Sequence, residues 1–456
     1  MPSPRRAYRT LFSDRRFFRL FLPVAVPIAL QNLVSSLTSL GAGLLVGQLG
    51  DDALAGVSLA GQVQFLMILA SFGIGSGAAI FTSQFWGRGD RDGVAKTQGV
   101  GLVLSVTVGL LFGAFAGFFP ELLLRVFTPD QGVVAEGAKY LRASTWSFPL
   151  TAVGMSYSLV LRSVGDTRTP LQFAVVGLVV QLVAALTLIF GVGPVPALGT
   201  AGAGVALVFA RLAETGGIIA FTQLKKHPNA GFARLFAFNA AFLSRYLRVA
   251  LPVVVSEILW ATGISGVKAI YGWMGATELA SVAVVETFSQ LVFIVFFGTG
   301  NAAAVIIGHA IGRGDRAEAK HLAGNVALFA PFMGVLMALP LALAAPLLPL
   351  LFNVTPDVRA LSTQLVWVVC VLLPGRAFYH DMIVGVLRGG GDTNFSLVMD
   401  QSGIWLWALP LGWTMAFVLH WPFLLVYFLI GLEEPLKSML ALWRVKTGRW
   451  IREVTR

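Results

Sequence analysis

The side chains most able to do chemistry in this sequence are ionisable groups that stand inside long apolar stretches. Glu257 and Lys268 share one stretch, Glu286 lies in the next, and His380 and Asp381 are adjacent in a later one. A charged side chain in a lipid bilayer costs several kcal/mol unless it is paired or hydrated, so such residues commonly mark ion or substrate pathways. A carboxylate in this setting can alternate between holding a proton, holding Na⁺ and balancing a cationic substrate.

These charges belong to the second of two sequence repeats. The tetrapeptide Gly-Arg-Gly-Asp at 87–90 recurs at 312–315, a shift of 225 residues, and Leu-Arg at 161–162 recurs at 387–388, a shift of 226. The charged residues have uncharged counterparts at these shifts: Glu257 matches Asn32, Lys268 matches Gly43, Glu286 matches Gly61 and Asp381 matches Met155. The ion chemistry is therefore expected in the second half, and a site between two such halves is typical of transporters.

A structural role is the alternative for the same charges, because buried ion pairs can fix the register of packed helices. Asp400 is expected near a helix end with such a role. Glu257 and Lys268 are eleven residues apart, close to three helical turns, and thus share one helix face about 16 Å apart along the axis. They are predicted to mark two ends of one hydrated path rather than to touch each other.

The elements that must position these groups are membrane-spanning helices. Apolar residues make up 56% of the 456 residues and charged residues only 12%, about half the share of a soluble domain. Because a span needs about 20 apolar residues, we predict an all-α integral membrane protein with twelve helices. The spans are placed at roughly 17–44, 53–84, 94–119, 137–161, 169–191, 200–223, 242–273, 278–311, 318–350, 359–387, 394–418 and 421–444.

The basic residues predict the orientation of these spans. One set of loops carries most of them, with Arg88, Arg162, Arg313 and Arg388 among its members, whereas the other set is nearly free of them. The positive-inside rule puts the basic loops and both termini in the cytoplasm. With six spans in each half, the two repeats then run in the same direction across the membrane, so the two lobes are expected to be related by a pseudo-twofold axis along the membrane normal.

The chain is predicted to hold two lobes and one linker. Residues 1–223 form the first lobe, the polar stretch 224–241 is a cytoplasmic linker, and residues 242–456 form the second lobe with a basic tail. The net charge of +11 does not indicate nucleic-acid binding, since the basic residues lie between apolar runs. The single cysteine excludes an intramolecular disulfide, and the sequence lacks a phosphate loop or a cluster of residues typical of an enzyme or a metal site.

The motifs together resemble the multidrug and toxic compound extrusion (MATE) family. The chain is similar to it in Val46-Gly47-x-Leu49-Gly50 after the first span, in the paired Gly-Arg-Gly-Asp turns, and in the Leu-Arg-x-x-Gly-Asp-Thr motifs that close spans 4 and 10. The resemblance implies a V-shaped two-lobe fold and alternating access. It also implies export of organic cations or other amphiphiles, driven by inward Na⁺ or H⁺.

The chain departs from many such relatives in its first span. They carry an Asp about four residues before the Val-Gly pair, where this sequence has Ala42. We therefore expect the ion site of the first lobe to be absent. An acidic site in the second lobe, with carboxylates from spans 7, 8 and 10, is similar in kind to the cation site of other members.

We accordingly predict a multidrug efflux antiporter of the bacterial inner membrane rather than an enzyme. Glu257 is the main coupling carboxylate and the place where Na⁺ would bind, with Glu286 and Asp381 assisting. Its partners are a small-molecule substrate and membrane lipid, and it needs no cofactor beyond H⁺ or Na⁺ and no second subunit. The predicted lining of the substrate cavity is polar or aromatic: Asn32, Gln62, Trp260, Lys268, Thr287, Asn301 and His380.

An alternative function stays open from the sequence. Lys268 and Arg376 leave room for a cationic cavity, which would suit a flippase or exporter of lipid-linked or anionic amphiphilic substrates. The sign of the charge at the site distinguishes this alternative from the export of cations.

Overall fold

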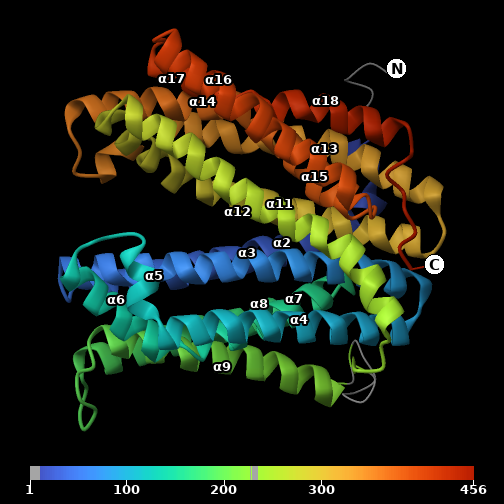
Figure 1. Cartoon of the computed structure of the whole chain (residues 1–456). Coiled ribbons are helices and arrows are strands. Elements are labelled where there is room, and N and C mark those ends of the chain that lie inside the picture. The colour runs from blue at the N-terminus through green and yellow to red at the C-terminus, as the bar shows by residue number, and fades with distance from the viewer. Residues whose placement is uncertain (1–10, 226, 228–234, 456) are drawn as a thin grey trace. The chain divides into compact units, whose positions relative to one another are not determined.

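The computed structural model describes residues 11–225, 227 and 235–455 of the chain. Within these residues every regular element is helical (Figure 1). By length and composition, nine helices of the described part can each cross a membrane. Most of the predicted linker 224–241 lies outside the described residues, since 226 and 228–234 are not among them.

The chain divides into two compact units. One, here called the N unit, comprises Leu30–Val254, and the other, the C unit, comprises the described residues up to Ala29 together with those from Val255 onward. Both divisions fall inside long helices, α2 (Arg15–Gly47) and α11 (Ala240–Met274). The predicted lobe limits at 223 and 242 follow the sequence repeat and stay a prediction.

The N unit is built from the end of α2, the start of α11 and the helices between them. These are α3 (Asp51–Arg88), α4 (Arg91–Phe118), α5 (Pro120–Arg125), α6 (Gln131–Ser144), α7 (Ser147–Ser163), α8 (Arg168–Phe190) and α9 (Thr200–Lys225). Close backbone approach relies on small residues here: a Cβ on Gly73 would lie 2.6 Å from the backbone of Val254 in α11.

The C unit holds the start of α2, the end of α11 and all later elements. These are α12 (Ala276–Gly312), α13 (Arg316–Ala344), η1 (Leu348–Leu351), α14 (Pro356–His380), η2 (Asp381–Arg388), α15 (Thr393–Gly403), η3 (Ile404–Ala408), α16 (Leu409–Trp413), η4 (Thr414–Val418), α17 (Phe423–Gly431) and α18 (Glu433–Lys446). Aromatic packing joins the start of α2 to α13: Phe17 stacks on Phe21 with ring centroids 4.9 Å apart, and Phe21 meets Phe329 edge-on.

Three of the predicted spans are interrupted helices rather than continuous ones. Span 4 is divided between α6 and α7, span 11 contains the π-helical segments η3 and η4, and span 12 is divided between α17 and α18. α6 is polar on one face, with Glu136, Lys139 and Arg142 in its 14 residues. These three spans are therefore helical, but each is built from more than one helical segment.

The repeated Gly-Arg-Gly-Asp sequences form the tight turns predicted for them. Gly89 and Gly314 each have a φ of 79°, a left-handed conformation that glycine adopts without strain. The following aspartates cap the next helices, since Asp90 accepts a hydrogen bond from the Gly93 N–H and Asp315 accepts one from the Glu318 N–H, both at 2.8 Å. Each turn thus ends one long helix and starts the next.

This capping yields a stability prediction. Replacing Asp315 by Ala should lower the free energy of unfolding by about 1 kcal/mol, because the Glu318 N–H loses its acceptor. Thermal unfolding of the purified protein in detergent measures the effect. Asp315→Asn is the matched control, since an amide oxygen can cap equally well, and equal melting temperatures for the Ala and Asn variants would contradict the assignment.

Candidate ion-coupling site

A π-helical segment carries two of the charged residues of the C unit. Asp381 begins η2 and Arg388 ends it, directly after α14. π-Helical turns are uncommon inside α-helices and are frequently found at functional sites. Both side chains are buried: Asp381 is 1% exposed and Arg388 is 5% exposed. The prediction that Arg388 belongs to a basic cytoplasmic loop is therefore wrong, because its side chain is buried among packed helices.

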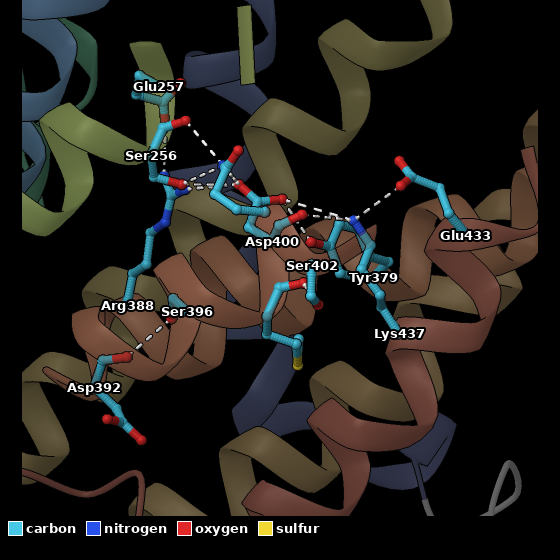
Figure 2. Close-up of polar contacts among 12 residues, drawn as sticks. Ser256, Glu257, Tyr379, Arg388, Asp392, Ser396, Asp400, Ser402, Glu433 and Lys437 are labelled. Carbon is cyan, nitrogen blue, oxygen red and sulfur yellow. Dashed lines mark hydrogen bonds and ion pairs between the residues drawn. The ribbon is translucent and has the colours of Figure 1, made fainter. Parts of the chain in front are cut away.

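Arg388 is the centre of a buried ionic cluster (Figure 2). Its Nη1 lies 2.7 Å from Oε1 of Glu257, on α11, and donates a hydrogen bond to it. Its Nη2 lies 3.7 Å from Oδ2 of Asp400, on α15. One guanidinium thus faces two carboxylates, and charges removed from water are tolerated only when they are compensated in this way.

Asp400 is held by several hydrogen bonds besides its ion pair. The Tyr379 hydroxyl donates to Oδ1 at 2.6 Å, and the Ser256 hydroxyl donates to Oδ2 at 2.9 Å. Gln401 supports Ser256 by donating from Nε2 to its Oγ at 3.1 Å. Two neighbouring residues of α11 thus have different partners in this network: Ser256 binds the carboxylate of Asp400, and Glu257 binds the guanidinium of Arg388.

Lys437 of α18 closes the other end of the cluster. Its Nζ donates to the backbone carbonyl of Asp400 at 3.1 Å and lies 3.9 Å from Oδ1 of the same residue. Oε2 of Glu433 is 3.7 Å away, and the ammonium stands 4.3 Å from the centre of the Tyr379 ring. A cation over an aromatic face gains further electrostatic stabilisation.

The formal charges of this cluster do not cancel. We define the cluster by its five ionisable members, the carboxylates of Glu257, Asp400 and Glu433 and the cations of Arg388 and Lys437. With all five ionised, the sum is one negative charge. Desolvation penalises an uncompensated charge, so one added proton or monovalent cation would stabilise the cluster.

Asp381 forms a second acidic position in the same unit. The Thr299 hydroxyl of α12 donates to its Oδ1 at 2.9 Å. Its Oδ2 is buried and has no hydrogen-bond partner among the described residues, and the same holds for Nε2 of His380. The His380 ring packs edge-on against Phe297, with 5.1 Å between centroids. A buried carboxylate oxygen without a partner is suited to hold a proton or a cation.

Glu286, predicted as an assisting coupling carboxylate, and Lys268, predicted as a cavity residue, form an ion pair with each other. Nζ of Lys268 lies 2.8 Å from Oε2 of Glu286, with both side chains about two-fifths exposed. Lys268 therefore pairs with a carboxylate of the next helix, and its place at one end of a hydrated path from Glu257 stays a prediction. Arg376 is likewise paired, with Oε2 of Glu434 at 3.2 Å from its Nε.

The predicted cavity residues are spread over both units. In the C unit, the amide of Asn301 donates to the Phe297 carbonyl and the hydroxyl of Thr287 donates to the Ala283 carbonyl, so both bond within their own helix. Trp260 is 37% exposed. Asn32 is partly buried and Gln62 exposed, both within the N unit. Their role in a cavity stays a prediction.

Sequence reasoning missed the central position of Arg388 and Asp400, although the repeat carried a signal. In the N unit Arg162, the counterpart of Arg388, donates from Nε and Nη2 to Oε1 of Gln31 at 3.2 and 2.6 Å. Gln31 matches Ser256, the neighbour of Glu257, at the shift of 225. In both halves the arginine of the Leu-Arg pair therefore reaches back to the first span of its own half.

Comparison with known proteins supports the sequence motifs. The profile of the MatE family matches residues 27–187 and 252–414, one stretch in each half. The chain is 27% identical over 413 residues to the probable multidrug resistance protein NorM of Bradyrhizobium diazoefficiens, covering 87% of this chain and 86% of that protein. It is 25% identical to the probable multidrug resistance protein YoeA of Bacillus subtilis, with 88% and 87% covered.

The fold agrees with solved structures. A crystal structure of MATE in the bent conformation superposes with a TM-score of 0.87 at 18% identity and covers 97% of this chain and 98% of that one. This likeness confirms the predicted fold class, an all-α membrane protein with twelve spans in two lobes. The family profile extends over well more than half of the residues, and its members are transporters rather than enzymes. The chain therefore belongs to the MatE family, the multidrug and toxic compound extrusion transporters.

Proposed function

We propose that this transporter is a secondary antiporter that exports organic cations or cationic amphiphiles in exchange for inward H⁺ or Na⁺. The observation that carries the proposal is the buried cluster around Arg388, in which three carboxylates face two cations and leave one negative charge in excess when all five groups are ionised. A net negative site attracts a cation rather than an anion. The printed names of NorM and YoeA, probable multidrug resistance proteins, support the same substrate class.

Glu257 and Asp381 are proposed as the coupling carboxylates. Antiport requires that the driving ion and the substrate bind the two conformations with different affinities. Glu257 can exchange its ion pair with Arg388 for a bound ion, and Asp381 has a buried oxygen to which an ion or proton can bind. Glu286, already paired with Lys268 in a more exposed position, has a secondary role.

The location follows from the charge pattern and the family. The bacterial relatives and the apolar helices support a multi-pass protein of the inner membrane. Arg88 and Arg313 lie at the two Gly-Arg-Gly-Asp turns, and the basic tail after α18 adds further positive charge, which supports cytoplasmic termini. We propose that one chain forms the complete transporter.

The carboxylate of Glu257 provides the first test. Glu257→Gln should reduce gradient-driven movement of a fluorescent lipophilic cation in proteoliposomes at least tenfold, because the neutral amide binds Na⁺ more weakly than a carboxylate and cannot release a proton. A Na⁺ gradient and a pH gradient are imposed separately, so that the wild type identifies its driving ion. Glu286→Gln is the matched control and should keep most of the activity.

The outcomes of this test are distinct. Full activity of Glu257→Gln would remove Glu257 from the coupling mechanism. A wild-type protein that is folded and oriented but moves no cation under either gradient would contradict the cation-antiport proposal and favour lipid-linked or anionic substrates, which the same vesicles can then be used to test.

Asp381 gives a second, independent prediction. Asp381→Asn keeps an acceptor for the Thr299 hydroxyl but removes the desolvated carboxylate. We expect a melting temperature equal to or above that of the wild type, together with at least a tenfold loss of transport. A structural role predicts the opposite combination, a lower melting temperature with transport retained in the folded fraction.

A further inference from the structure

The guanidinium of Arg388 is positioned unequally between its two carboxylates. Nη1 makes a short hydrogen-bonded ion pair with Glu257 at 2.7 Å, whereas Nη2 is 3.7 Å from Asp400, too long for a hydrogen bond. All three side chains are at most 14% exposed. A small rotation of the arginine side chain would shorten one contact and lengthen the other, so Asp400 is an available second partner.

The two carboxylates differ in how much they depend on Arg388. Asp400 accepts hydrogen bonds from Tyr379 and Ser256 and has Lys437 within 3.9 Å. These groups compensate its charge while Arg388 is bound to Glu257. Glu257 has Arg388 as its charged partner in the cluster. A cation that reaches Glu257 must therefore compete with Arg388.

In the N unit the corresponding arginine donates its hydrogen bonds to a neutral amide, with the carboxylate of Glu214 acting on it only electrostatically. Arg162 makes two hydrogen bonds to the neutral amide oxygen of Gln31. This contact ties the end of α7 to α2. Arg388 ties η2 to α11 in the corresponding way, yet its partner is Glu257. The two halves therefore differ in the group that the arginine directly binds, an amide in the N unit and a carboxylate in the C unit.

We propose that Arg388 is a resident counter-cation, which occupies Glu257 when the coupling ion is absent and moves to Asp400 when that ion binds. This inference rests on the proposed function and adds a mechanism of ion release. Arg388 weakens the binding of the ion to Glu257 and displaces it on return. Without Arg388 the ion binds more tightly and leaves more slowly.

The groups that set the charge around Arg388 come from five elements. They are Glu257 of α11, Tyr379 and His380 of α14, Asp381 of η2, Asp400 of α15, and Glu433 and Lys437 of α18. Because several of them can exchange protons, the coupling ion is tested as Na⁺ at fixed pH and as H⁺ at fixed Na⁺.

The test measures ion binding directly in the purified full-length protein. An ion that binds the folded state raises the melting temperature with its concentration, so the half-maximal concentration reports affinity. Melting is recorded against NaCl, with choline chloride holding ionic strength constant, and separately against pH. For Arg388→Gln we expect the half-maximal Na⁺ or H⁺ concentration to fall about tenfold or more, because the competing cation is gone.

Matched variants separate competition from packing. Arg162→Gln removes the equivalent arginine of the other repeat and should leave the half-maximal concentration unchanged. Arg388→Lys retains the positive charge and should stay close to the wild type. Asp400→Asn removes the second carboxylate to which Arg388 could move, so Arg388 stays on Glu257 and the half-maximal ion concentration should rise. If Arg388→Gln does not fold, this variant tests the competition between Arg388 and the ion.

Each outcome supports or overturns the inference. An unchanged midpoint in Arg388→Gln, an equal shift in Arg162→Gln, or a lower midpoint in Asp400→Asn contradicts competition by Arg388. Absence of any ion-dependent stabilisation in wild type and Arg388→Gln also overturns it. These binding results are independent of transport, so a wild type that binds ions but moves no cation in vesicles counts against the proposed function alone.

Discussion

The ion pair between Arg388 and Glu257 is the interaction on which the charged part of the C unit depends. It joins the π-helical end of the tenth span to the seventh span, and the hydroxyl and ammonium groups around Asp400 extend the same network to α14 and α18. Removing Arg388 alone would leave the Glu257 carboxylate buried without its charged partner, which costs more than the pair contributes. The pair therefore constrains the chemistry of every acid around it.

Comparison of the two repeats distinguishes the features that both halves share from the charged groups found in one half. In both halves an arginine from the Leu-Arg motif reaches the first span, and in both a glycine turn is followed by a capping aspartate. Only the partner differs, an amide at Gln31 and a carboxylate at Glu257. A scaffold that works with a neutral partner can keep its helix packing while one half acquires ion chemistry.

The sequence predicted the helical membrane fold, the repeat and the family, because hydrophobic length and motif spacing are properties of the chain itself. It did not predict the interruptions of spans 4, 11 and 12, which depend on how neighbouring helices satisfy the freed backbone groups. It identified Glu257 and Asp381 as candidates but missed the place of Arg388 and Asp400. Which charged side chains pair depends on how each helix is rotated about its axis, and this rotation is not given by residue spacing. The ion pair between Lys268 and Glu286 of the next helix is an example.

The net charge of the cluster bears on how an ion gradient could drive a conformational change. With the ion bound, Glu257, Asp400 and Glu433 are matched by Arg388, Lys437 and the ion, so the cluster is neutral and can remain desolvated. With the ion absent, one negative charge is uncompensated, and a conformation that admits water is favoured. In the proposed antiport, ion binding would therefore shift the balance between a dehydrated and a hydrated state, which is the difference in affinity that a coupled transporter requires. Under the proposed antiport, a cationic substrate would supply the same charge in the ion's absence, and the ion and the substrate would exchange at this site.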